Sequence, residues 1–406
     1  MRGVSRSNAS QELRQRDTDV VFPKPGQRHT HDPAGARPAA LSRLARRDTR
    51  PALMTTRTRV VIVDDSPTAR SSLRLALERD RAVEVVGEAQ DAHWALHCAR
   101  SLGPDLVLMD VYLQHENGLD VAAAIMEEAP CPILVVTAVN PSDPGLVYRA
   151  VEVGALDVCA KLPGPEHALY EQERRRLVEL VKSLARVPVV RRRRAGHSRR
   201  SPTGRASIVP ARCQPKVQVV AIGASTGGPP VVSELLRGLA VGTETSILVA
   251  QHMASGFMRG FAEWLEAGCR WPIHLVEKAQ PIRPGHVYLA TDNRHITLPQ
   301  PRVVAPSDDA PRRHHRPSID MLLDDVARHH QAGSMAILLT GMGDDGAEGL
   351  LHVRRAGGLT IVQDPETCAV DSMPVRAIGL GAAQAVLPPW RIKEALTRVL
   401  SPDRAG

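Results

Sequence analysis

Residues 57–185 alternate short apolar runs with segments whose apolar positions recur at helical spacing. Such alternation is typical of strand–helix repeats that build a parallel sheet with helices on both faces. The apolar runs lie at 59–64, 83–87, 105–110, 132–137 and 156–160. Because each run is followed by a helical pattern, the segment is predicted to be a flavodoxin-like (βα)5 domain.

Residues 217–406 repeat the same alternation over a longer span. The predicted strands are 217–223, 246–251, 273–277, 286–290, 335–341, 359–363 and 383–387. The predicted helices are 230–239, 257–267, 318–331, 346–356, 374–379 and 389–400. This pattern predicts a larger doubly wound, mainly parallel α/β domain.

Two basic segments flank the first of these domains. Residues 1–56 are rich in Arg, Pro, Ala and Gly without apolar periodicity, and we expect a disordered basic extension there. Residues 186–216 hold ten Lys and Arg and no Asp or Glu, which predicts a flexible basic linker. The net charge of +8 therefore resides in these segments, and the two domains together are acidic.

Composition narrows the class of protein further. The 406 residues are 43% hydrophobic but only 3% aromatic, which suits α/β domains built on Val, Leu, Ile and Ala. The six cysteines are scattered without a C-x-x-C pair, so we expect reduced thiols in a cytoplasmic protein and no zinc site. No apolar run reaches transmembrane length, and no membrane insertion is expected.

Polar residues follow four predicted strands of the first domain. Asp64 and Asp65 follow strand one, Asp110 follows strand three, Thr137 ends strand four and Lys161 follows strand five. The carboxyl ends of parallel strands share one edge, so these groups should converge. Clustered carboxylates suit Mg²⁺. A hydroxyl and an ammonium beside them suit a phosphoryl group carried on a carboxylate. Helix capping accounts for one such Asp, but not for the whole set.

The stretch "VVAIGASTGGPP" (219–230) ends a predicted strand of the second domain. Its Ser225 could be a nucleophile, part of a phosphate-binding loop or a turn residue. A P-loop needs a Gly-Lys-Ser/Thr run, and a dinucleotide fingerprint needs another glycine spacing, so both are disfavoured. A nucleophilic serine needs a base and an orienting acid. His252 ends the next strand in "VAQHM", and Asp344 and Asp345 follow another strand in "GMGDDG".

The first domain resembles a response-regulator receiver domain at "VDDSPTAR", "DLVLMDV", "VVT" and "AK". The resemblance implies that Asp110 is phosphorylated, that Asp64, Asp65 and Asp110 hold Mg²⁺, and that Thr137 and Lys161 are the phosphoryl-switch residues. The sequence departs from the family at three places. Leu113-Gln114 replaces the usual Met-Pro, Leu162 separates Lys161 from its proline, and Val158 replaces an aromatic residue.

The whole span 57–400 is similar to the chemotaxis protein-glutamate methylesterase (CheB) family. The second-domain motifs that carry this resemblance are "GASTGGP", "AQHM", "PGHVYLATDNRHI", "RPSIDMLLDDVA", "LLTGMGDDGAEG" and "VQDPETCAVDSMPVRAI". It implies hydrolysis of glutamate methyl esters, and in some members glutamine deamidation, with no cofactor for the esterase reaction. Ser225 maps onto the nucleophile, His252 onto the base and Asp345 onto the acid. Backbone N–H groups at Thr226 and Met342 are our candidates for stabilising the oxyanion.

The same resemblance implies the partners. The substrate would be methylated chemoreceptor cytoplasmic helices, and the phosphodonor a histidine kinase of the CheA type. We hypothesise that the unphosphorylated receiver covers the Ser225 edge and that phosphorylation of Asp110 favours an open state. The rival hypothesis is a phosphorylation-gated, non-enzymatic regulator that binds nucleic acid through its basic linker. The second domain has no helix-turn-helix pattern, so nucleic acid is not an expected partner.

Several other polar residues have less specific interpretations. The spacing of four histidines fits no standard metal-ligand set, so they are interpreted as surface or structural residues; they are His286, His295, His314 and His315. Arg283 and Arg316 are expected near the site, where they would steer acidic receptor segments.

Overall fold

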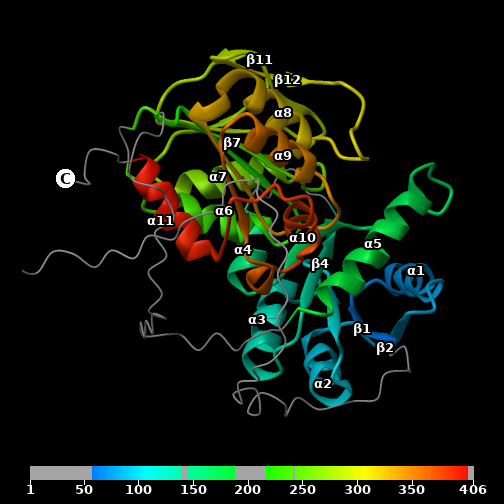
Figure 1. The fold of residues 1–406 in the computed structure, drawn as a ribbon. Coiled ribbons are helices and arrows are strands. Elements are labelled where there is room, and N and C mark those ends of the chain that lie inside the picture. The colour runs from blue at the N-terminus through cyan, green and yellow to red at the C-terminus, as the bar shows by residue number, and fades with distance from the viewer. Residues whose placement is uncertain (1–56, 139–144, 188–215, 241–242, 401–406) are drawn as a thin grey trace, which may run out of the picture. The chain divides into compact units, whose positions relative to one another are not determined.

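The computed structural model describes residues 57–138, 145–187, 216–240 and 243–400. The predicted N-terminal extension and nearly all of the predicted linker lie outside these residues, so their boundaries remain predictions. Figure 1 shows the elements of the two α/β domains, each of which is described by itself below.

The first domain is a five-stranded parallel sheet in the order β2-β1-β3-β4-β5. The strands are β1 (Thr58–Val63), β2 (Val83–Ala89), β3 (Leu106–Met109), β4 (Ile133–Thr137) and β5 (Asp157–Ala160). All five predicted strands are present. The central strands contain buried apolar runs, Val60–Val63, Leu106–Met109 and Ile133–Val136, as expected of parallel strands covered on both faces.

Five helices cover the two faces of this sheet. They are α1 (Pro67–Glu78), α2 (Ala92–Leu102), α3 (Gly118–Glu128), α4 (Leu146–Glu152) and α5 (Tyr170–Leu184). Buried residues of α1 and α5 pack together on one face, and those of α2, α3 and α4 pack on the other. Side-chain caps define several helix starts. Ser66, for example, accepts a hydrogen bond from the Ala69 N–H just before Pro67.

The second domain contains a seven-stranded parallel sheet in the order β15-β14-β13-β6-β7-β10-β8. Its strands are β6 (Val219–Ala224), β7 (Ser246–Gln251), β8 (Ile273–Leu275), β10 (Val287–Leu289), β13 (Ser334–Leu338), β14 (Leu359–Gln363) and β15 (Ala385–Leu387). These seven strands are the predicted ones, and the doubly wound, mainly parallel fold is confirmed.

Helices again cover both faces of the larger sheet. Buried residues of α6 (Gly228–Leu236), α7 (Met258–Gly268) and α11 (Pro389–Leu400) form the core on one face. The opposite core is formed by α8 (Ile319–His330), α9 (Ala347–Arg355) and α10 (Ser372–Gly379). Val219 and Ala221 of β6 face one core while Val220 and Ile222 face the other, as the two-residue repeat of a strand requires.

One small sheet was not predicted from the sequence. Strands β9 (Gln280–Pro281), β11 (His295–Gln300) and β12 (Val303–Ser307) pair antiparallel in the order β11-β12-β9. Figure 1 shows β11 and β12 beside α8, and α8 beside α9. The proline-containing sequence of this hairpin obscures its strand pattern, because proline removes a ladder donor. Among the described residues, no helix is both long enough and apolar enough to cross a membrane.

Candidate active site and carboxylate pocket

Ser225 follows the last residue of β6 in a turn with a fixed backbone. Its N–H donates to the carbonyl of Thr340 at 3.0 Å, and its carbonyl accepts from the Gly228 N–H at 2.8 Å. The same carbonyl accepts from Gln251 Nε2 at 2.8 Å. Gly227 has φ 73°, a left-handed conformation that favours glycine. The turn therefore holds Ser225 at the carboxyl edge of the sheet, ahead of α6.

A second turn, after β13, passes directly over this serine. A Cβ at Gly341 would lie 2.6 Å from the Cβ of Ser225 and would also strike the sulfur of Met373. Only a glycine permits such a close approach. Thr340 Oγ1 lies 3.0 Å from the carbonyl oxygen of Thr226, so it links the two turns.

His252 directly follows β7, the strand beside β6. Ala224 pairs with Gln251 in the ladder, and the His252 N–H donates to the Ala224 carbonyl at 2.9 Å. Ser225 and His252 are therefore the first residues past neighbouring strand ends. The imidazole Nε2 lies 2.9 Å from Asp345 Oδ2. The other ring nitrogen, Nδ1, is buried and has no hydrogen-bond partner among the described residues.

Asp345 is fully buried and accepts from donors on both carboxylate oxygens. Oδ1 accepts from Ser318 Oγ and the Asp320 N–H, each at 3.0 Å, and Oδ2 accepts from the Ile319 N–H at 2.7 Å as well as from His252. Burial alone would raise its pKa. The hydrogen bond and charge of His252, with the N–H donors of α8, instead hold the pKa of Asp345 well below its usual range.

The start of α8 is itself fixed by one of the four histidines interpreted as surface or structural. His295 Nδ1 accepts from the Ser318 N–H at 3.0 Å, and its Nε2 lies 3.3 Å from the Ala310 carbonyl. Burial lowers the pKa of His295, which suits a neutral ring that both accepts and donates. His286 pairs with His274 at 2.7 Å, and His314 is exposed. His295, His286 and His314 therefore agree with their interpretation as surface or structural residues.

The fourth of these histidines lies against the candidate base. The rings of His315 and His252 stack with centroids 4.0 Å apart and planes 7° apart. The sequence contains no signal for this contact, because His315 lies in a loop without strand or helix periodicity.

Of the two arginines expected near the site, Arg283 is instead beside Ser246, the first residue of β7, at the opposite end of the strand from His252. Arg316 binds Asn293 Oδ1 at 3.0 Å.

The two candidate oxyanion donors differ from their neighbours in hydrogen bonding. Among the described residues, neither the Thr226 N–H nor the Met342 N–H donates to a protein acceptor. The flanking Gly341 N–H is bound to the Val370 carbonyl at 2.8 Å, and the Gly343 N–H to Ser372 Oγ at 3.0 Å. Both candidate donors therefore keep their N–H groups free of protein acceptors.

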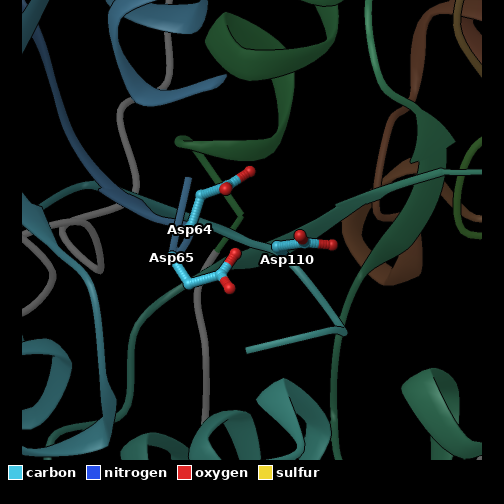
Figure 2. A group of neighbouring side chains, drawn as sticks. All are labelled: Asp64, Asp65 and Asp110. Carbon is cyan, nitrogen blue, oxygen red and sulfur yellow. The ribbon is translucent and has the colours of Figure 1, made fainter. Parts of the chain in front are cut away.

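The carboxylates of the first domain converge as predicted. Oxygens of Asp64, Asp65 and Asp110 all lie within 4.8 Å of one another. Figure 2 shows Asp64 and Asp65 after the end of β1 and Asp110 after the end of β3. Lys161 Nζ lies 2.7 Å from both Asp64 Oδ2 and Asp110 Oδ2. Burial alone would lower the pKa of Lys161, but the hydrogen bonds and charges of Asp110 and Asp64 raise it above its ordinary value.

Thr137 completes this edge at the end of β4. It is fully buried, and its Oγ1 has no hydrogen-bond partner among the described residues. Leaving a buried hydroxyl without a hydrogen-bond partner costs free energy, and an oxygen of a bound ligand would provide that partner.

Val158 is buried in β5, and the position that is usually aromatic therefore holds a small aliphatic side chain.

Comparisons with known proteins cover both domains. Residues 60–170 match the response regulator receiver domain, and residues 220–396 match the CheB methylesterase domain. A protein-glutamate methylesterase/protein-glutamine glutaminase of Geobacter metallireducens is 39% identical over 343 residues, which cover 84% of this chain and 98% of the relative. One of Myxococcus xanthus is 38% identical over 331 residues, with 81% and 93% covered.

Two solved structures are each similar to part of this chain. The CheB methylesterase catalytic domain of Thermotoga maritima is 33% identical, and the match covers 45% of this chain and 98% of that one, with a TM-score of 0.44. The response regulator domain of the same organism's CheB is 28% identical, with 32% and 98% covered and a TM-score of 0.30. The extent and identity of the curated relatives confirm the resemblance, and the chain belongs to the CheB family of protein-glutamate methylesterases with a receiver domain.

Proposed function

We propose that the chain is a serine hydrolase that removes methyl esters from glutamate side chains of receptor proteins and deamidates glutamine side chains. Its relatives are named for both of these reactions. One observation at the site carries the proposal. His252 binds Asp345 through Nε2 at 2.9 Å, while its buried Nδ1 has no partner in the described part of the chain. A ring held by an acid at one nitrogen and free at the other is suited to accept a proton.

In the proposed mechanism, His252 Nδ1 takes the proton from the Ser225 hydroxyl as the serine oxygen attacks the ester carbonyl. The Asp345 carboxylate accepts from Nε2–H and stabilises the imidazolium that forms. His252 then gives its proton to the leaving methoxide, and methanol departs. A water attacks the acyl-enzyme by the same route and restores Ser225 and a glutamate carboxylate. With a glutamine side chain, the leaving group is ammonia.

The negative charge of the tetrahedral intermediate needs donors that are already in place. We assign this role to the N–H groups of Thr226 and Met342, since both lack a protein acceptor in the described residues. A donor that is not already bound to a protein acceptor can meet the oxyanion without first breaking a hydrogen bond. The expected contribution of one such donor is roughly 10²–10³ in kcat.

Methanol release from a methylated receptor tests the hydrolase. Ser225→Ala should abolish release while the melting temperature stays close to that of the wild type. Ser233→Ala is the matched control, because Ser233 is also buried but lies within α6, away from the reacting groups. Ammonia release from a receptor carrying glutamine tests the second reaction with the same variants. Turnover that persists in Ser225→Ala would rule out this serine as the nucleophile.

We further propose that phosphorylation of Asp110 stimulates the hydrolase. The carboxylate of Asp110 lies 2.7 Å from Lys161 Nζ, which is suited to hold the oxygens of a phosphoryl group on it. The Thr137 hydroxyl, buried without a partner in the described residues, would satisfy another oxygen. The opening of a covered Ser225 edge remains our hypothesis for how the signal is transmitted.

The carboxylate pocket also fits a divalent cation. Asp64, Asp65 and Asp110 offer three oxygens within 4.8 Å of one another, a donor set that suits Mg²⁺. When bound, the cation supplies positive charge that neutralises a phosphoryl group. The chain's own contribution is to gather these oxygens at one sheet edge and to place Lys161 opposite them.

The regulation is tested by methanol release with and without a small-molecule phosphodonor. The wild type should be stimulated, and Asp110→Asn should not respond although its unstimulated rate persists. Asp120→Asn, an exposed change at the start of α3, is the matched control and should respond like the wild type. An undiminished response in Asp110→Asn would contradict the assignment.

The proposed partners are a histidine kinase of the CheA type and the methylated cytoplasmic helices of chemoreceptors. The rival nucleic-acid regulator depends on the basic linker, almost all of which lies outside the described residues. The comparisons favour the hydrolase instead. Salt-sensitive DNA binding, together with normal cellular function in a Ser225→Ala strain, would instead support the nucleic-acid-binding regulator.

A further inference from the structure

His252 is restrained along two perpendicular directions. Within the plane of its ring, Nε2 is hydrogen bonded to Asp345 Oδ2 at 2.9 Å. Across the plane, the ring of His315 lies nearly parallel to it, with centroids 4.0 Å apart and an angle of 7°. A single hydrogen bond at one edge leaves an imidazole free to rock about that contact. A flat ring against its face blocks this motion.

His315 is presented by a turn that is unusual for its residues. Arg312 and His315 exchange two backbone hydrogen bonds, of 3.2 and 2.9 Å. The two residues between them, Arg313 and His314, both have positive φ, 51° and 67°. Glycine and asparagine usually occupy such positions, because a side chain there strains the backbone. Strain of this kind persists only where the surrounding structure holds the turn in place.

Ion pairs supply that restraint. Arg313 contacts Asp344 at 2.6 Å and Glu348 at 2.5 Å, and its Nε lies 3.3 Å from the fully buried Asp320. Arg312 contacts Asp324 of α8 at 2.6 Å. The turn is therefore fastened to the same helix start that holds Asp345. Movement of His315 relative to the His252–Asp345 pair would break several of these contacts.

The edge of the His315 ring faces the turn that carries a candidate oxyanion donor. Its Nε2 would lie 3.8 Å from a Cβ placed on Gly343, the residue after Met342. The ring is thus in reach of both the candidate base and this turn. Within the described ranges, the contact of the His315 ring with the candidate base is made through its flat face.

The electrostatics of His315 suit a position beside a forming imidazolium. Burial, and then the neighbouring charge of His252, lower the pKa of His315 to about 3. The ring therefore stays neutral at physiological pH. A neutral ring adds no repulsion when His252 takes the serine proton, whereas a permanent cation at this distance would oppose that step.

We propose that His315 is a positioning residue, whose ring stacks on His252 and holds the imidazole in the orientation that directs Nδ1 toward Ser225. This inference rests on the proposed function, in which His252 is the base. It assigns to the 312–315 turn a role in proton transfer that its charged sequence does not suggest. Misplacing a general base by about 1 Å is enough to lower a rate by roughly 10²-fold.

The test measures methanol release by the full chain, with kcat and KM determined separately. His315→Ala should lower kcat by about 10- to 100-fold and leave KM within about threefold, because the reacting group is disturbed rather than the receptor surface. His315→Phe keeps a flat neutral ring and should recover kcat to within about threefold of the wild type. His314→Ala, a change at the exposed neighbour in the same turn, is the matched control.

Further variants keep the proposal open to refutation. If His315→Ala unfolds, His315→Leu and His315→Phe are compared, since both fill the space but only Phe provides a flat ring. Equal kcat in these two, or wild-type kcat in a folded His315→Ala, would overturn the positioning role while the proposed function stands. Turnover retained by Ser225→Ala would overturn both proposals together.

Discussion

The replacement of Asp345 by asparagine tests the hydrogen-bond network of the site most directly. All four partners of the carboxylate are donors: Ser318 Oγ, the backbone N–H groups of Ile319 and Asp320, and the His252 ring. An asparagine amide carries one acceptor oxygen and one NH₂ group. Whichever way it is turned, its NH₂ faces a backbone N–H that cannot become an acceptor.

The magnitude follows from this count of donors. A buried N–H left without an acceptor costs about 1–3 kcal/mol, and the hydrogen bonds that remain lose the strength that the charge gave them. We therefore expect Asp345→Asn to lower the free energy of unfolding by about 2–4 kcal/mol. If the NH₂ faces His252, the ring must present Nε2 as an acceptor and carry its proton on Nδ1. That tautomer cannot accept the Ser225 proton, so kcat should fall by about 10³–10⁴.

Two measurements check this prediction on the same preparation. Urea unfolding followed by circular dichroism gives the stability, and methanol release gives kcat. Asp344→Asn is the comparison, because Asp344 is partly exposed and its ion pair with Arg313 is worth only about 0.2–1 kcal/mol. That variant should lose about threefold in kcat at most. Asp345→Asn with wild-type stability and a kcat within tenfold of the wild type would refute the reasoning.

Three further predictions concern packing, pH and the receiver pocket. Gly341→Ala forces a methyl group to within 2.6 Å of the Ser225 Cβ, so urea unfolding should show a loss of about 1–3 kcal/mol and methanol release should fall. The pKa values of His295 and His315 are lowered by burial, so the unfolded chain binds more protons below the ordinary histidine pKa of about 6.5. Stability should therefore fall between pH 7.5 and 5.5, less steeply in His315→Phe, and an unchanged slope would contradict this assignment. Lys161→Met removes the cation 2.7 Å from Asp110, so the response of methanol release to a phosphodonor should be lost while the unstimulated rate remains.

The sequence alone was sufficient to predict the elements that obey local rules. Short apolar runs predicted the strands of both parallel sheets, and each run showed where a strand ends. Because parallel strands end at one edge, the positions of Ser225 and His252 after β6 and β7, and of Asp344 and Asp345 after the β13 run, predicted that these groups meet, and the family resemblance singled out Asp345. The structure places His252 Nε2 2.9 Å from Asp345 Oδ2. The same reasoning predicted that Asp64, Asp65, Asp110 and Lys161 converge. The structure places the three carboxylates within 4.8 Å of one another and pairs Lys161 with Asp64 and Asp110.

The surroundings of these groups, by contrast, could not be predicted from local sequence patterns. The hairpin of β11 and β12 escaped prediction because its prolines hide the strand pattern, yet its His295 holds the helix start that binds Asp345. His315 lies in a loop whose strained turn is stabilised by carboxylates of the next helix, α8, and of the more distant α9. Strand ends follow from local hydrophobic pattern, whereas the conformation of such a loop follows from long-range ion pairs and ring contacts that exist only after the chain has folded.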